Sequence, residues 1–257
     1  MIAVKPRAGA AAAMRSALHE PMALIAANAP GAATGKDPEH LHRLRVGARR
    51  LRAALRASRG LWRKHEVRAL LRQLRALAAV SGPARDWDVF LRNAPDALRG
   101  RARRRQRLAR AALRRVLNAM QPLRLPRAAD GARQGWRAFA RDALERLDRK
   151  ALRRAARTDW TDPASRHALR VLLRRLRYVA EFTQDAFAVR SARILIRSLK
   201  DLQDLLGALN DIDVARRLTR ELSGRQVPPR ERERKLLSQL PGAWRQFAAA
   251  PRFWRRK

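Results

Sequence analysis

The amino-acid sequence contains the same segment twice, with an offset of 125 residues. Residues 37–90 and 162–215 align without a gap and are identical at 19 of 54 positions. The dipeptide Asp-Pro opens both copies, and the pattern Gly-x-x-x-Asp-x-Asp-Val lies near the end of both. Self-similarity at one fixed offset over this length indicates a duplicated structural unit. We therefore expect two similar helical subdomains related by a pseudo-two-fold axis.

Long segments rich in alanine, leucine and arginine fill most of the chain, separated by sparse glycine and proline. These residues are good helix formers, whereas β-branched and aromatic residues are too few for a substantial sheet. We expect an all-α fold of two pseudo-symmetric antiparallel bundles with a basic central groove or pore. The repeats should cover residues 8–119 and 132–248 of a single domain of residues 1–257. The expected helices lie near residues 8–27, 38–61, 65–81, 84–98, 101–119, 132–156, 163–187, 190–206, 209–222 and 229–248.

Capping residues predict where the helices of each copy begin and end. Asp37 and Asp162 each precede a proline, which is typical of an N-cap followed by the first helical residue. A glycine in each copy is expected to end the next helix as a C-cap residue, and an aspartate four residues later to begin the following one. These residues are Gly82, Asp86, Gly207 and Asp211.

The first long helix of each copy carries a ribbon of arginines beside its apolar face. At about 100° per residue, six arginines fall between roughly 260° and 340° from His42, namely Arg45, Arg49, Arg52, Arg56, Arg59 and Arg63. The neighbouring arc between roughly 180° and 240° holds the apolar residues Leu44, Ala48, Leu51, Leu55 and Trp62. Ordinary solvated charges lie opposite the apolar face. A basic ribbon directly beside the core therefore predicts that these arginines face a ligand.

The next helix of each copy adds three cations on one face. Arg68, Arg72 and Arg75 have the spacing i, i+4, i+7, and their equivalents 125 residues later are also basic. Cations kept in register across a diverged duplication are hard to explain by a general arginine bias. The candidate binding residues are His42, Arg45, Arg49, Arg52, Arg56, Arg68, Arg72, Arg75, His167, Arg170, Arg174, Arg177, Arg193, Arg197 and Lys200.

The charge balance indicates the class of partner. The chain has 60 lysine and arginine residues against 22 acidic ones, a formal net charge of +38. This surplus repels itself in a compact fold, so it indicates a polyanionic partner. Cysteine is absent, which excludes disulfides and thiolate metal sites, and no apolar run is long enough for a membrane span. The N-terminal segment lacks the strongly hydrophobic stretch of a signal peptide, and we expect a cytoplasmic protein.

The paired motifs resemble the CHAD family, the conserved histidine α-helical domain. The match rests on His-x-Leu-Arg-Val-x-x-Arg-Arg-Leu-Arg at residues 42–52 and 167–177, and on Gly-x-x-x-Asp-x-Asp at residues 82–88 and 207–213. The resemblance covers roughly residues 8–248. It implies two four-helix bundles about a basic central pore, specific binding of inorganic polyphosphate by the residues named above, and association with polyphosphate granules. Sulfate or phosphate would occupy the groove when polyphosphate is absent.

The sequence does not point to catalysis. Phosphoryl-transfer enzymes need metal-binding carboxylates or a phosphate loop, and the sequence has neither a glycine-rich loop nor a carboxylate cluster. We expect a protein without enzymatic activity, cofactor or metal. Three roles stay open for His42 and His167: contact with phosphate, orientation of neighbouring groups, or packing. The aspartates expected to cap helices and hold arginines in position are Asp86, Asp88, Asp211 and Asp213.

Nucleic-acid binding is the main alternative, because a basic surface is also its electrostatic footprint. Aromatic residues make up only 5% of the chain, so there is no platform on which single-stranded bases could stack. The sequence also lacks helix-turn-helix spacing and zinc ligands. We therefore expect nucleic acid to bind only non-specifically. A third possibility is a scaffold that coats anionic granules or lipids, which shares the same electrostatics and could coexist with polyphosphate binding.

Overall fold

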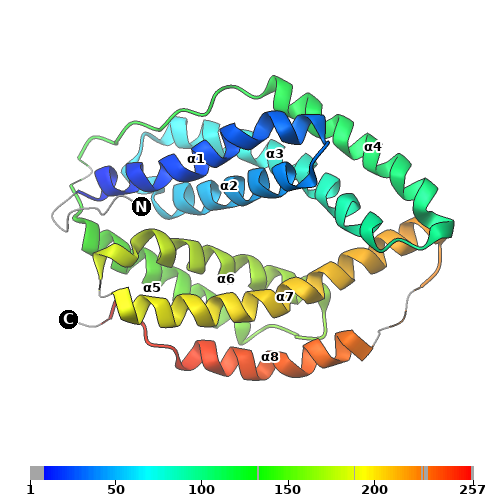
Figure 1. Ribbon diagram of the computed structural model, residues 1–257. Coiled ribbons are helices and arrows are strands. Elements are labelled where there is room, and N and C mark those ends of the chain that lie inside the picture. The colour runs from blue at the N-terminus through cyan, green and yellow to red at the C-terminus, as the bar shows by residue number, and fades with distance from the viewer. Residues whose placement is uncertain (1–8, 132, 188, 227, 229–230, 256–257) are drawn as a thin grey trace. The chain divides into compact units, whose positions relative to one another are not determined.

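The computed structural model describes residues 9–131, 133–187, 189–226, 228 and 231–255 (Figure 1). It confirms the all-α class, because the described residues form eight α-helices and no strand beyond the isolated bridges Gly9–Gly135 and Trp62–Ala128. Among the described helices, none is both long and apolar enough to cross a membrane. The α-helices are α1 (Ala10–Thr34), α2 (Pro38–Ala57), α3 (Lys64–Arg92), α4 (Asp96–Ala119), α5 (Trp136–Ala155), α6 (Pro163–Thr183), α7 (Val189–Ser223) and α8 (Glu231–Ala249), with 3₁₀ turns η1 (Arg59–Leu61) and η2 (Gln184–Ala186).

These helices form two compact units. The first unit holds residues 14–132 and 215–226, and so contains the first copy of the repeat. The second unit holds the described residues of 1–13, 133–214 and 227–257, and contains nearly all of the second copy. The start of α1 therefore belongs to the second unit and the end of α7 to the first. Two units are compatible with a duplication, and the expected repeat boundaries stay a prediction.

In the first unit α3 packs against both α2 and α4. Leucines of α2 and α3, such as Leu51 and Leu74, are fully buried between the helices. The approach of α1 to α2 depends on Gly47, because a Cβ atom there would lie 2.9 Å from the carbonyl oxygen of Pro21. A side chain at residue 47 would thus push α1 away from the arginine-bearing helix α2.

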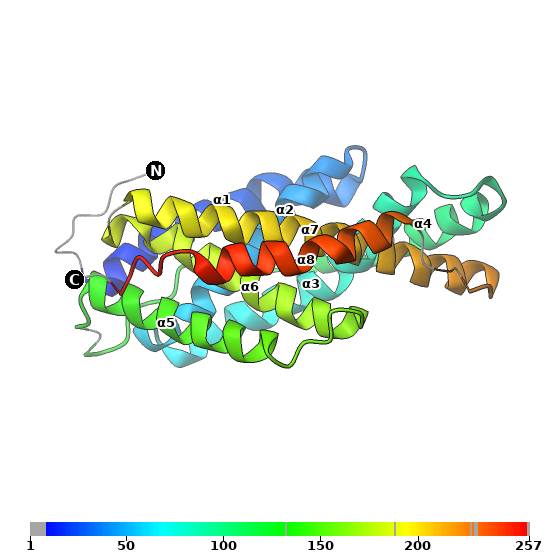
Figure 2. The same cartoon turned by 90° about the horizontal axis from the view of Figure 1, so that it is seen from below.

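In the second unit α5 packs against α6, and α5, α6, α7 and α8 run roughly along one direction (Figures 1 and 2). The segment after α8 folds back onto α5. Its Arg252 pairs with Asp148 of α5 at 3.1 Å, and the Asp148 side chain is completely buried. Trp254 of the same segment is also buried, and its indole nitrogen donates to Glu145 at 2.8 Å. The chain end therefore belongs to the core of this unit.

The expected starts of the two arginine-bearing helices are confirmed. Asp37 is the N-cap of α2, and its side chain accepts a hydrogen bond from the backbone N–H of Glu39 at 2.8 Å. Asp162 is the N-cap of α6 and accepts from Ser165 at 2.7 Å. In each copy these bonds satisfy a backbone donor that has no partner inside the helix.

The expected helix ends at Gly82 and Gly207 are wrong, because α3 and α7 run through both glycines. A glycine that ends a helix usually takes a positive φ, and neither of these does. Gly35 and Gly224 have φ values of 70° and follow α1 and α7 instead. Helix α3 passes through Gly82 because buried side chains continue on both sides of it, from Leu77 to Trp87, and their burial outweighs weak local propensity. Asp86 and Asp211 therefore lie inside helices and begin none.

Candidate functional site

The arginine ribbon of the first copy lies along α2 beside the core, as the helical period predicts. Arg45, Arg49, Arg52 and Arg56 are half-buried, whereas the leucines of the neighbouring face are buried. Helix α2 ends at Ala57, four residues before the expected end, so the regular ribbon ends at Arg56. Over this stretch the helix places one guanidinium about every 5 Å along its axis.

Arg45 lies over Gly82, the glycine of the repeated motif in α3. Its Nη1 atom would be 3.5 Å from a Cβ atom built on Gly82, and it donates to the hydroxyl of Ser81 at 3.4 Å. The second copy repeats this contact, since Nη2 of Arg170 would be 3.6 Å from a Cβ atom on Gly207. The glycine therefore leaves room for the guanidinium of the ribbon, a role different from the C-cap that the sequence suggested.

Arg52, Arg56 and Arg75 form a cluster of positive charge between α2 and α3. Burial lowers the pKa of the Arg52 guanidinium, and the positive charges of Arg56 and Arg75 lower it further. The Nε atoms of Arg49 and Arg52 are buried and have no hydrogen-bond partner among the described residues. Within the described part of the chain, no carboxylate forms an ion pair with these four arginines. The cluster is therefore an uncompensated positive site inside one unit.

His42 stands at the beginning of this ribbon. Burial lowers the pKa of its imidazole, and the neighbouring positive charge of Arg85 lowers it further. Arg49 and Arg45 act in the same direction, while Glu39 opposes them. In the free protein the neutral imidazole is therefore favoured, and a bound anion would reverse this preference.

The second copy holds its histidine differently. Nδ1 of His167 lies 3.0 Å from Oδ1 of Asn210, which occupies the position of Arg85 in the first copy (210 − 85 = 125). Asn210 and Arg85 stand inside the repeated glycine–aspartate motif, but the sequence analysis assigned neither of them a binding role. Their equivalent positions in the repeat were the available signal, but a change of residue type between the copies hid it.

The second ribbon also carries its own counter-charge. Arg177, the equivalent of Arg52, forms an ion pair with Glu181 at 2.8 Å and donates to Gln203 at 3.0 Å. Its guanidinium also lies 5.0 Å from the centre of the Tyr178 ring. Glu181 stands where the first copy has Arg56, so the positive potential of the second ribbon is weaker at this point.

The three-residue basic faces of the following helices are exposed in both copies. They consist of Arg68, Arg72 and Arg75 on α3, and Arg193, Arg197 and Lys200 on α7. Their exposure leaves them accessible to an anion within each unit. The basic groove expected between the two copies stays a prediction.

The motif aspartates Asp88 and Asp213 hold arginines that lie outside the ribbons. Asp88, whose side chain is 2% exposed, accepts from Arg110 of α4 at 2.8 Å and from Gln106 at 2.7 Å. Asp213 pairs at 2.9 Å with Arg166, a cation whose side chain is only 3% exposed. These pairs fix α4 to α3 and α6 to α7, so their role is to stabilise the frame of the site. Among the described residues there is no group of three or more histidine, aspartate or glutamate side chains placed to hold a metal.

Comparison with known proteins identifies a family. Residues 16–220 match the family model of the CHAD domain. The structure is similar to the crystal structure of the CHAD domain from the plant Ricinus communis, with 26% sequence identity and a TM-score of 0.72, covering 98% of this chain and 96% of that chain. It also shares its fold with PptA from Streptomyces chartreusis, at 14% identity and a TM-score of 0.56, covering 95% of this chain and 99% of that chain. No curated protein sequence matches the chain.

Proposed function

Because the chain belongs to the CHAD family, we propose that it binds inorganic polyphosphate through the arginine ribbons of α2 and α6. The observation that carries the proposal is the cluster of Arg49, Arg52, Arg56 and Arg75. Two unit charges about 8 Å apart repel by about 2 kcal/mol at an effective dielectric near 20. A phosphate chain would supply the missing negative charge and could accept hydrogen bonds from the terminal guanidinium nitrogens of these arginines.

The ribbon suits a linear anion better than a compact one. From Arg45 to Arg56 the helix rises about 16 Å, and an arginine faces the same side at every turn or nearly so. An extended chain of phosphates lying along α2 could therefore meet each guanidinium in succession. Arginine can bind two oxygens of one phosphate at once, and every unit of a polyphosphate chain presents such oxygens.

The proposed activity is binding without catalysis, in the cytoplasm and on polyphosphate granules. Nucleic acid is the principal competitor for the same positive charge, since its phosphates are also regularly spaced. Binding through phosphate alone should follow the density of negative charge along the ligand. Polyphosphate carries this charge on every repeating unit without bases, so it can approach a half-buried ribbon more closely than a duplex.

The test is competition binding at fixed salt. Labelled long-chain polyphosphate bound to the protein is challenged with unlabelled polyphosphate, duplex DNA and single-stranded RNA at equal phosphate concentration. We expect unlabelled polyphosphate to displace the label and both nucleic acids to displace little of it. Equal displacement by nucleic acid would contradict the proposal.

A pair of variants locates the binding surface. Arg45→Glu with Arg170→Glu should weaken polyphosphate binding by tenfold or more, roughly the loss of two charge-assisted contacts. The control is Arg141→Glu with Arg146→Glu, two exposed arginines of α5 with the same change in net charge. Equal losses in the two variants would show that diffuse charge, and not the ribbon, binds the polymer.

A further inference from the structure

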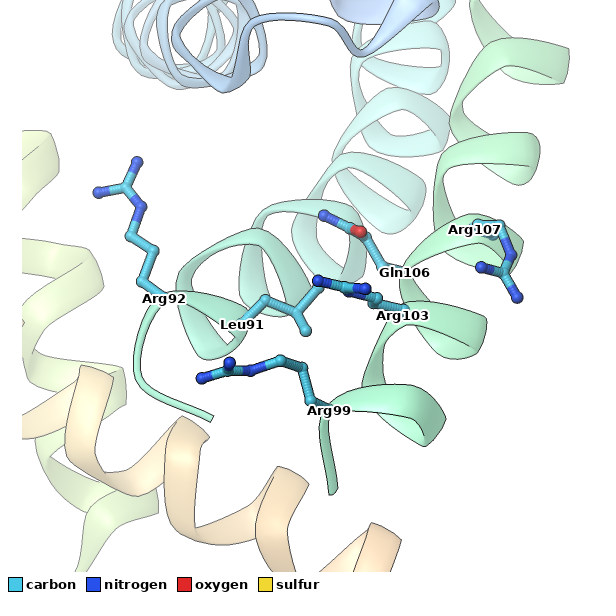
Figure 3. Close-up of a pocket in the computed structure, with 6 residues that line it drawn as sticks. All are labelled: Leu91, Arg92, Arg99, Arg103, Gln106 and Arg107. Carbon is cyan, nitrogen blue, oxygen red and sulfur yellow. The ribbon is translucent and has the colours of Figure 1, made fainter. Parts of the chain in front are cut away.

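A second group of arginines lies in the first unit, where the end of α3 meets the start of α4. Six residues line a pocket of about 460 Å³ there: Leu91, Arg92, Arg99, Arg103, Gln106 and Arg107 (Figure 3). Arg99 and Arg103 extend from α4 toward Leu91, and Arg92 and Arg107 flank them on the two sides. None of these residues belongs to the ribbons or to the repeated motifs.

The pocket is strongly positive. Arg99 forms an ion pair with Asp96 at 2.9 Å and donates to the backbone oxygen of Ala94 at 3.2 Å, so one of the four cations is partly neutralised and held in place. Arg92, Arg103 and Arg107 form no ion pair with any described residue. Three arginines that line one pocket without a carboxylate partner make its potential strongly positive, and an anion would relieve their mutual repulsion.

The walls of the pocket are fixed by contacts behind it. Gln106 donates to the buried carboxylate of Asp88, which also accepts from Arg110 of the same helix. This network joins α3 to α4 directly beneath the arginines. The network fixes the two helices and Gln106, while the arginine side chains themselves are exposed and accessible to a ligand.

Spacing and size indicate the class of ligand. Arg99, Arg103 and Arg107 follow the spacing i, i+4, i+8 and therefore span about 12 Å on one face of α4. One phosphate cannot reach guanidinium groups spread over that length. The pocket lies within the range of about 300–1,000 Å³ that is typical of small-molecule sites, and its lining includes no aromatic ring on which a base could stack.

We propose that this pocket is a separate site for a compact anion that carries several phosphate groups, of the size of tripolyphosphate. It is separate from the charge cluster of Arg52, Arg56 and Arg75, because Arg92 lies roughly 25 Å along α3 from Arg75. The ligand could be a free oligophosphate or the end of a longer chain, since both present the same clustered phosphates. Its occupancy does not depend on the ribbons.

The first test measures tripolyphosphate binding by titration calorimetry at constant salt. Arg92→Gln with Arg103→Gln and Arg107→Gln should weaken this binding by at least about tenfold, the change expected from the loss of even one charge-assisted hydrogen bond. The charge-matched control is Arg141→Gln with Arg146→Gln and Arg153→Gln, three exposed arginines of α5, and it should change the affinity less than about threefold, as expected for surface charge. Equal losses in the two triple variants would overturn the proposal.

The second test separates this pocket from the ribbon. The variant Arg45→Glu with Arg170→Glu should keep at least one tripolyphosphate site of unchanged affinity, even though its affinity for long-chain polyphosphate falls by tenfold or more. If this variant loses all tripolyphosphate binding while the pocket variant keeps it, the compact anion binds the ribbon and the pocket proposal fails. If the unchanged protein binds tripolyphosphate in the pocket but does not bind long chains, the proposed function is refuted and the pocket proposal stands.

The third test locates the ligand chemically. An arginine-specific reagent such as phenylglyoxal, followed by peptide mass spectrometry, should modify Arg103 and Arg107 more slowly when tripolyphosphate is bound. Orthophosphate at the same total phosphate concentration should protect them less. Unchanged modification with tripolyphosphate, or equal protection by orthophosphate, would contradict a site for several phosphates. Long chains with capped ends distinguish a chain end from a free oligophosphate. If uncapped long chains protect Arg103 and Arg107 and capped chains do not, the pocket binds the end of a chain.

Discussion

Nδ1 of His167 lies 3.0 Å from the side-chain oxygen of Asn210, whereas the equivalent neighbour of His42 is the cation Arg85. An amide oxygen only accepts, so Nδ1 of His167 carries the proton in this contact. Nε2 can then donate to a phosphate only when the ring is doubly protonated. In the first copy the cation disfavours that charged form. The two histidines of the repeat therefore occupy equivalent positions but have different neighbours, an amide oxygen for His167 and a cation for His42.

Replacing Arg85 by asparagine should raise the pKa of His42. Arg85 is the largest charge that lowers this pKa, and asparagine is the residue of the second copy. The change is followed by NMR titration of the imidazole Cε1–H signals. Arg115→Asn, a substitution at an exposed arginine of α4, serves as control and should leave the signal of His42 unchanged. A lowered or constant pKa in Arg85→Asn would contradict this electrostatic assignment.

The same shift predicts how stability depends on pH. The folded-state pKa of His42 lies below its ordinary value of 6.5, so below that pH the unfolded chain binds a proton more readily than the folded protein does. The contribution of His42 to the free energy of unfolding is therefore present above pH 6.5 and falls as the pH drops below it. The free energy of unfolding is measured at pH 7.5 and at a pH below 6.5. The difference between the two values should be smaller in His42→Gln than in the unchanged protein. Bound polyphosphate should raise the pKa of His42 and reduce this loss of stability at low pH, because an anion stabilises the imidazolium.

Exchanging the residues that distinguish the ribbons should change their affinities in opposite directions. Arg56→Glu places a carboxylate beside Arg52 and should weaken polyphosphate binding several-fold. Glu181→Arg removes the partner of Arg177 and should strengthen binding. The slope of log affinity against log salt concentration depends on how many phosphate groups the protein contacts. It should change by about one for each phosphate contact that a substitution creates or removes. Binding isotherms over a series of salt concentrations measure the affinity and its salt dependence. If the affinity changes in the same direction in both variants, the two ribbons do not differ in charge as proposed.

Two substitutions of Gly82 should separate stability from binding. In Gly82→Ala the new Cβ atom would lie 3.5 Å from Nη1 of Arg45, an ordinary van der Waals contact. Replacing glycine by alanine inside a helix should then raise the free energy of unfolding by about 1 kcal/mol and leave polyphosphate affinity unchanged. Gly82→Leu should fill the space of the Arg45 guanidinium and weaken polyphosphate binding. Chemical denaturation and binding are measured on both proteins, and equal affinities would show that this space is not used.

Removing the buried carboxylate of Asp148 should destabilise the second unit. Asp148→Asn leaves Arg252, which is 8% exposed, without its counter-charge, and breaking one side of a buried ion pair costs about 3–5 kcal/mol. Urea denaturation measures this loss. Asp204→Asn removes the same charge from an exposed position of α7 and should change the free energy of unfolding by less than about 0.5 kcal/mol. A similar small loss in both variants would mean that the C-terminal segment is not held by this pair.

Local patterns were sufficient for much of the fold. The helical class and the starts at Asp37 and Asp162 depend on propensity and on hydrogen bonds within three residues. The position of the arginines beside the core depends on the helical period alone. These features are set by neighbours in sequence, so the sequence predicts them, and the offset of 125 residues shows which of them occur twice.

The tertiary structure decided what depends on distant partners. Whether α3 ends at Gly82 was settled by the burial of Leu77 and Trp87 on either side, which outweighs the weak propensity of glycine and proline. The pairing of Asp148 with Arg252 joins residues 104 apart, and the arginine pocket forms only where α3 meets α4. The sequence by itself determined which residues share a helix face. Only packing between helices determined which charges are neutralised and which are left for a ligand, because that balance depends on distances across the fold and not along the chain.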